Sequence, residues 1–144
     1  MHPLFKKASE LTETIIAGSI EVDRNKGPGL IESIYEWCLL IELKLRGLLC
    51  VSQKAIVVQY KGFTREERLR FDILVEECLL VEAKAVQSVL PIHKAQVLSY
   101  MKLLNVPLGL LINFHETRLI NGIHRLILPG ANQTSDQQTE EAKE

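Results

Sequence analysis

The residues best suited to chemistry lie in one stretch, FDILVEECLLVEAKAV, which carries Asp72, Glu82 and Lys84. Two segments that cover most of this stretch, residues 69–75 and 79–85, are rich in Leu, Ile and Val, with charged residues at even spacing. That period of two predicts two β-strands joined by a tight turn. We therefore expect a β-hairpin that carries two acids and a lysine.

The register of this hairpin decides whether the three side chains meet. A turn over residues 76–78 sets Asp72 opposite Glu82, and opposed residues share a face with their Cβ atoms about 5 Å apart. Lys84 is two residues from Glu82 and shares that face. Two carboxylates at this separation suit Mg²⁺ or Mn²⁺, and an adjacent ammonium can orient a water molecule for attack on a phosphodiester. The alternative is an exposed cross-strand ion pair on a solvated sheet face.

The pattern Glu-x-Lys has little specificity by itself, because it occurs three times in the chain. The copy at 42–44 falls in a helical pattern, where residues two apart point to opposite sides. The copy at 141–143 lies in a polar tail. Only the copy at 82–84 combines a strand with a second carboxylate ten residues upstream.

Composition is compatible with one compact enzyme domain, since the chain has 144 residues and is 47% hydrophobic. The formal net charge of -1 and pI of 6.4 exclude binding of nucleic acid by bulk positive charge, so such binding requires a local basic patch. Three unevenly spaced cysteines favour a reducing compartment over a disulfide or zinc framework. Neither a signal-peptide core nor a long apolar run is present. We expect a cytoplasmic protein without a membrane partner.

Three helices are expected around the hairpin, because apolar residues recur at helical spacing over 9–25, 30–46 and 92–104. Ser9 is the expected N-cap of the first helix. The second helix has a wide apolar arc that is expected to pack in the core. The arc consists of Leu30, Ile31, Ile34, Trp37, Cys38, Ile41 and Leu45.

Strands are expected on both sides of the hairpin, over 51–60, 107–114 and 119–128. The last is interrupted at Asn121-Gly122, a strong signal for a hairpin turn. The polar tail, 131–144, is predicted to be disordered. The order of elements predicts an α/β fold with a central mixed β-sheet flanked by helices, in a single domain over residues 1–130.

A carboxylate on the second helix is the first candidate to join the site from a distance. At 100° per residue, Glu32 projects between Leu39 and Leu43 and so leaves from a partly apolar surface. Tyr35 and Glu36 follow three and four residues later on the same side. A functional carboxylate and a salt bridge at the rim are both open interpretations of Glu32.

The third helix carries a polar stripe at positions i, i+3 and i+7, formed by His93, Gln96 and Tyr100. Such a stripe usually contacts another polar group. A hydrogen-bonded helix edge and a contribution to the site of the hairpin are both compatible with it.

Several blocks of the sequence together resemble a known family. The phrase GLIESIYE, residues 29–36, matches the Gly-x-x-Glu-x-x-Tyr signature of the GxxExxY protein family, a branch of the PD-(D/E)XK nuclease superfamily. The hairpin stretch, PIHKAQVLSYMKLL, GLLINF and NGIHRLIL resemble later blocks of that family, in the same order. The resemblance covers residues 11–128 and implies a PD-(D/E)XK nuclease-like fold.

The resemblance also implies roles for individual residues. Mg²⁺ or Mn²⁺ would be held by Asp72, Glu82, the backbone carbonyl of Ala83 and, through a water or a second metal, Glu32. Lys84 would orient or help to activate the attacking water. A Gln-x-x-x-Tyr element that supports the site and the nucleic acid is matched by Gln96 and Tyr100.

Basic side chains near the site are expected to hold the substrate backbone. Arg68 and Arg70 alternate in phase with Asp72 and should project toward the nucleic acid, although a solvated strand end is an equal alternative. His93 and Lys94 are further expected contacts. No motif indicates base-specific readout.

These observations favour a divalent-metal-dependent nuclease that hydrolyses phosphodiester bonds, with DNA as the expected substrate. The first alternative is a non-catalytic nucleic-acid-binding or protein-interaction module that retains the nuclease fold. The second is a metal-dependent hydrolase of a smaller phosphate ester. A homodimer is left open.

Overall fold

A computed structural model describes residues 1–134 of the chain and leaves residues 135–144 undescribed. The described elements follow in chain order as α1 (Phe5–Lys26), α2 (Glu32–Leu45), β1 (Cys50–Tyr60), β2 (Phe63–Val75), β3 (Leu79–Lys84), α3 (Pro91–Leu104), β4 (Leu108–Asn113), the 3₁₀ helix η1 (Leu119–Gly122) and β5 (Ile123–Ile127). None of the helices within residues 1–134 is long and apolar enough to cross a membrane.

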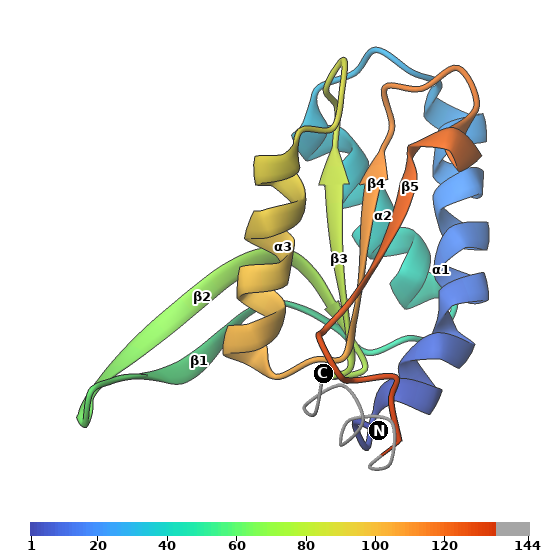
Figure 1. The fold of residues 1–144 in the computed structure, drawn as a ribbon. Helices are drawn as coiled ribbons and strands as arrows, with labels where there is room; N and C mark the ends of the chain where they lie inside the picture. Colours follow the sequence, from blue (N-terminus) through green and yellow to red (C-terminus); the bar gives the residue numbers. More distant parts are fainter. Residues whose placement is uncertain (135–144) are drawn as a thin grey trace.

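The strands form one mixed sheet in the order β1-β2-β3-β4-β5, in which β3 and β4 run parallel and the other neighbours antiparallel. Helices α1 and α2 cover one face of the sheet and α3 covers the other (Figure 1). A separate apolar cluster fills each of the two interfaces. The predicted α/β fold, a central mixed sheet flanked by helices, is confirmed.

The hairpin of β2 and β3 has the predicted register. Ile73 pairs with Val81 and Val75 with Leu79, and residues 76–78 form the turn. The pairing therefore brings Glu82, near the end of β3, to Asp72, as the spacing predicted.

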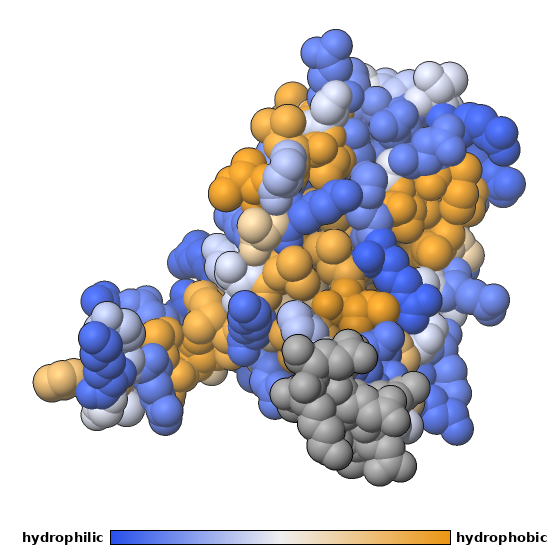
Figure 2. All heavy atoms as spheres, viewed as in Figure 1, coloured by the Kyte–Doolittle hydropathy of each residue, from blue (hydrophilic) through white to orange (hydrophobic). Residues whose placement is uncertain are grey.

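Strand β2 begins earlier than predicted, at Phe63 instead of residue 69. Its outer part pairs only with β1, and this two-stranded ribbon projects away from the body past α3 (Figure 1; Figure 2). We call residues 53–70 the arm. The polar run TREER in the arm lacks the apolar alternation of a half-buried strand, but backbone pairing with β1 holds it extended.

The prediction for the apolar arc of α2 is wrong. Its members stand largely in solvent, with Trp37 63% and Leu45 77% exposed. The buried side of the helix is instead formed by Tyr35, Leu39 and Leu43. Helix α2 is apolar on two sides, and packing on the sheet selects the side that also carries Glu32.

Two local expectations are also corrected. Ser9 is not an N-cap: it lies inside α1, and its Oγ accepts a hydrogen bond from Arg125 at 3.1 Å. Asn121-Gly122 is not a turn between two strands but part of η1. Glycine is needed there because a Cβ on Gly122 would lie 2.3 Å from the carbonyl oxygen of Asn113.

The predicted tail begins with ordered residues. Ala131 is buried, and its carbonyl accepts a hydrogen bond from the backbone N–H of His2 at 2.8 Å. The rest of that prediction, residues 135–144, lies outside the described residues.

Candidate active site

A cavity of about 310 Å³ opens where β2 leaves β3 to enter the arm. Side chains from four elements line it, although these elements are far apart in the sequence. The lining consists of Glu36 from α2, Arg70, Phe71 and Asp72 from β2, Glu82 and Lys84 from β3, and Gln96, Val97 and Tyr100 from α3.

The cavity exists because the backbone ladder between β2 and β3 stops at the pair Ile73–Val81. Beyond that pair, side chains take over the hydrogen bonds of the ladder. The Asp72 N–H donates to Glu82 Oε1 at 3.2 Å, and the Ala83 N–H donates to Asp72 Oδ2 at 2.7 Å. These two bonds hold both carboxylates at the edge of the cavity.

The carboxylates are poorly solvated, and this raises their pKa values. Burial, followed by the charge of Asp72, raises the pKa of Glu82 to about 8. Burial also raises the pKa of Asp72, against the opposing effect of the Ala83 N–H. Burial and the Asp72 carboxylate raise the pKa of Glu36. The cavity lining also carries three carboxylates against two cations, Arg70 and Lys84, and this excess favours protonation or a bound cation.

Lys84 is the nearest candidate cation to this pair, and Glu32 holds it in place. The Lys84 Nζ lies 3.5 Å from Glu32 Oε1, and the Ala85 N–H donates to Glu32 Oε2 at 3.4 Å. Glu32 thus reaches the end of β3, and its charge adds to the effect of burial in raising the pKa of Asp72. Glu32 is not among the residues that line the cavity.

Glu36 was not among the predicted site residues, yet its side chain lines the cavity and faces Asp72. The sequence contained a signal for it, because Glu36 lies one helical turn after Glu32 and shares its side of α2. Helix α2 therefore directs two carboxylates at the site, one to Lys84 and one to Asp72.

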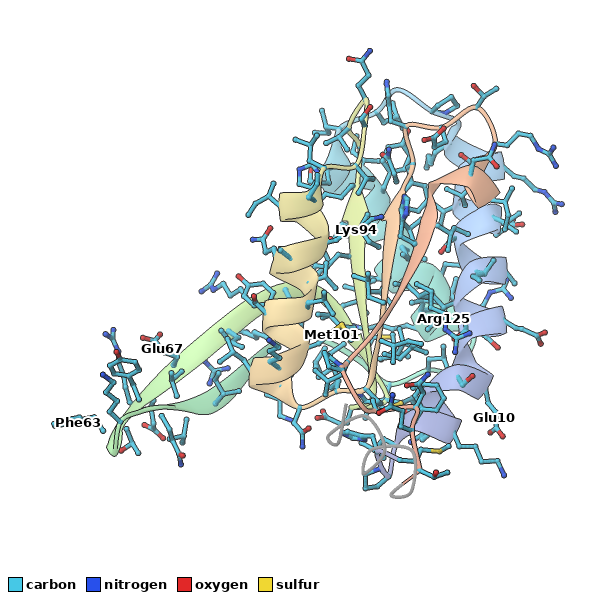
Figure 3. All side chains as sticks on the ribbon, viewed as in Figure 1. Glu10, Phe63, Glu67, Lys94, Met101 and Arg125 are labelled. Atoms are coloured by element: carbon cyan, nitrogen blue, oxygen red, sulfur yellow. The ribbon has the colours of Figure 1, made fainter. Side chains whose placement is uncertain are left out.

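The site face of α3 is brought close to the sheet. Gln96 and Tyr100 line the cavity opposite the acidic pair. Their helix can approach β4 because residue 109 is glycine: a Cβ there would lie 2.7 Å from the sulfur of Met101, which faces the sheet (Figure 3).

The expected nucleic-acid contacts do not all lie in one place. Arg70 lines the cavity, whereas Arg68 is exposed one step farther along the arm. His93 caps α3, since its Nδ1 accepts a hydrogen bond from the Leu90 N–H at 2.9 Å. Lys94 lies near His124 of β5, whose pKa is lowered by burial and then by the charge of Lys94. The structure thus brings Arg70 to the site and leaves His93 and Lys94 outside the cavity lining.

Two buried polar residues fix the segments of the chain that carry the site. The Tyr35 hydroxyl donates to the Gly27 carbonyl at 2.6 Å, and its ring stacks on Phe114 with centroids 4.6 Å apart. Asn113 accepts a hydrogen bond from the Val86 N–H at 3.1 Å and donates to the Val86 carbonyl at 2.9 Å. Tyr35 fixes the start of α2, and Asn113 fixes the chain that leaves Lys84. Asn113 was missed, although a polar residue ending the run GLLIN was a usable signal.

The donor set suits a hard divalent cation, because carboxylate and carbonyl oxygens are the ligands that Mg²⁺ and Mn²⁺ prefer. Among residues 1–134, no group of three or more His, Cys, Asp or Glu side chains is arranged as a complete metal site. A metal here would rest on the Asp72–Glu82 pair, a backbone carbonyl and solvent, as is usual for Mg²⁺.

The family model described as PD-(D/E)XK nuclease superfamily matches residues 9–126. No curated protein and no solved structure matches the chain significantly. The matched span contains Glu32, the Asp72–Glu82 pair, Lys84 and the three cavity residues of α3. The chain belongs to the PD-(D/E)XK nuclease superfamily.

Proposed function

We propose that the protein is a divalent-metal-dependent nuclease that hydrolyses phosphodiester bonds, with DNA as its substrate. One observation carries the proposal: Asp72, Glu82 and Lys84 line a single cavity in a chain of the nuclease superfamily. A solvated ion pair on an open sheet face would not combine one buried and one half-buried carboxylate with raised pKa values for both.

The proposed metal ligands are Asp72, Glu82 and the backbone carbonyl of Ala83. Bound there, Mg²⁺ or Mn²⁺ would supply charge neutralisation at the phosphate and lower the pKa of a coordinated water. The fit rests on the raised pKa values of both carboxylates, because a nearby divalent charge stabilises their ionised forms. Glu36 and Glu32 are proposed as the outer carboxylates, which orient water or a second cation.

The remaining residues of the cavity have proposed roles toward water and substrate. Lys84, held by Glu32, orients the attacking water with its ammonium group. Gln96 and Tyr100 face the acidic pair across the cavity and donate hydrogen bonds to a phosphate group. Arg70 at the cavity edge contacts the next phosphate along the strand.

We also propose that the chain belongs to the GxxExxY branch of the superfamily. Two signature residues have positions that support this assignment. Tyr35 anchors the start of α2 to the preceding loop, and Glu32 holds Lys84. The signature thereby couples the geometry of one helix to the lysine of the site.

The decisive experiment is incubation of the purified protein with linear, nicked and circular DNA in Mn²⁺, beside the Asp72→Asn variant. We expect cleavage by the wild-type protein alone, and the three topologies separate endonuclease from exonuclease action. A gel shift without cleavage would favour the non-catalytic binding module. Hydrolysis of a small phosphate ester without action on any DNA would favour a metal-dependent hydrolase of smaller phosphate esters.

The exposed arc of α2 supports a homodimer as a second proposal. Its six large members together expose the equivalent of about three whole side chains, on the order of 500 Å², at the upper end for a patch on a monomer. A two-fold dimer would pair this surface with itself. We expect the wild-type protein to sediment as a dimer and Trp37→Glu as a monomer. A monomeric wild-type protein at tens of micromolar would exclude this assembly.

A further inference from the structure

We infer that the arm, residues 53–70, is a nucleic-acid-binding arm that extends the substrate path away from the cavity. This inference rests on the proposed function, because it assigns a partner to a surface continuous with the candidate site. The partner is the sugar-phosphate backbone of duplex DNA on one side of the point of cleavage.

Charge is the first argument for this partner. The arm carries five lysines and arginines against two glutamates, a net charge of +3 in a chain with a formal net charge of -1. The rest of the chain therefore carries -4. The local basic patch that nucleic-acid binding requires in this acidic protein is the arm.

Several of these cations are available to a ligand. Lys54 pairs with Glu77 at 2.6 Å and Arg65 with Glu67 at 2.7 Å. Within residues 1–134, by contrast, Arg68 and Arg70 have no ion pair, and Lys61 lies only over the ring of Tyr60.

Continuity with the cavity is the second argument. A second hollow of about 240 Å³ lies at the root of the arm and shares Glu36, Arg70 and Phe71 with the cavity. Its remaining lining comes from Ser52 and Gln53 on β1. A strand that occupies the cavity can therefore pass directly onto the face of the arm that carries Arg70 and Arg68.

The third argument is the tip of the arm, where exposed aromatic residues end a basic ribbon. Tyr60 is 69% and Phe63 78% exposed, and Phe63 points away from the body at the tip (Figure 3). Aromatic rings of this kind pack on sugars and bases. Phe63 lies seven positions before Arg70 along the strand, so the tip lies roughly 23 Å from the cavity edge. At about 3.4 Å per base pair, the arm spans roughly seven base pairs.

The test is fluorescence anisotropy with a labelled duplex of about 24 base pairs in EDTA, where metal-dependent cleavage cannot occur. The double variant Lys61→Glu/Arg68→Glu should weaken binding more than tenfold and reduce the salt slope by about two, because two phosphate contacts are lost. Phe63→Ala should weaken binding severalfold with an unchanged salt slope, since an apolar contact releases no counterions. All three positions are exposed, so melting temperatures should match the wild type.

The matched control is Lys6→Glu/Lys7→Glu on the exposed surface of α1, which changes the net charge equally. We expect it to bind nearly as the wild type does. Equal losses in both double variants would overturn the inference in favour of bulk charge, and wild-type affinity in the arm variant would overturn it in favour of a protein contact. A wild-type protein that does not bind the duplex would overturn it as well. Cleavage in Mn²⁺ is scored separately, so an arm that binds DNA in an inactive protein contradicts only the proposed function.

Discussion

The two parts of β2 share one backbone but have opposite surroundings. The inner part, residues 71–75, has β1 and β3 as neighbours and a helix layer on each face, and four of its five side chains are buried. The outer part, residues 63–70, has only β1 beside it and no buried side chain. The inner part is held by packing, whereas the outer part is held by the ladder with β1.

These different surroundings limit where the fold can place a partly buried carboxylate beside an opening. Asp72 is the one residue of the inner part that is not buried, and it lies one step from the last pair between β2 and β3. Deeper in the sheet a carboxylate would have no room for a ligand, and farther out it would be solvated with an ordinary pKa. The junction between the inner and outer parts of β2, at Asp72, supplies both partial burial and an opening.

The largest effect is expected at the junction itself. Asp72→Asn should abolish the rise in melting temperature that Mg²⁺ or Mn²⁺ gives the wild-type protein, and should abolish cleavage. A metal at about 100 times its dissociation constant adds roughly 2.7 kcal/mol to the free energy of unfolding. Thermal melts with and without millimolar metal measure this, with Arg68→Gln in the arm as control. A wild-type melting temperature that is the same with and without either metal would contradict the metal site.

The inner part of β2 and the arm should differ sharply in what they contribute to the free energy of unfolding. Ile73→Ala in the buried inner part should lower the free energy of unfolding by about 2–5 kcal/mol, because it leaves a cavity in the core. Val57→Ala, on β1 in the arm and 58% exposed, should change it by less than about 0.5 kcal/mol. Urea titrations of both variants give the comparison. Similar losses would mean that the arm is packed against something in solution.

Lys84 should matter to chemistry more than to folding. Lys84→Ala removes a pair with Glu32 that is partly exposed and long at 3.5 Å, so the melting temperature should stay nearly unchanged. Turnover should fall about a hundredfold or more, because the group that orients the water is lost. Arg46→Ala, which breaks the ion pair with Glu42 on α2, is the matched control. Full activity of Lys84→Ala would remove this lysine from the mechanism.

The smallest effect is a pH dependence of the metal-free protein. The pKa of Glu82 is about 8 in the folded state, against an ordinary value of 4.5. Between pH 4.5 and pH 8, the folded protein therefore keeps a proton on Glu82 that the unfolded chain has released. Stability should therefore be full below about pH 4.5 with respect to this group, and should fall as the pH rises toward 8. Glu82→Gln should flatten that decline in melts recorded in EDTA. A decline of the same size in the variant would assign it to other groups.

Part of this site was readable from the sequence for a local reason. The alternation of charged and apolar residues and the short turn fixed the pairing of Ile73 with Val81, so the approach of Asp72 to Glu82 followed from spacing alone. The places of Gln96 and Tyr100 followed from helical periodicity together with the resemblance of several blocks in order. Both predictions depend on contacts between near neighbours or on one side of one helix.

What the sequence left undetermined is how elements meet. Helix α2 has apolar residues on two sides, and periodicity could not tell that Leu39 and Leu43 face the sheet while Trp37 faces solvent. Glu36 was overlooked for the same reason, since its partner Asp72 belongs to another element. The outer part of β2 was missed because its polar residues satisfy no local strand pattern and are held only by β1.

Spacing along one chain was enough to predict the three helices, the register of the central hairpin and the two acids and the lysine that this hairpin carries. Tertiary structure decided which side of α2 is buried, that Glu32 holds Lys84 while Glu36 faces Asp72, and that the basic ribbon leaves the sheet beside the cavity. Such contacts depend on burial and charge between residues up to 53 positions apart, as between Glu32 and Ala85, and no local pattern contains them.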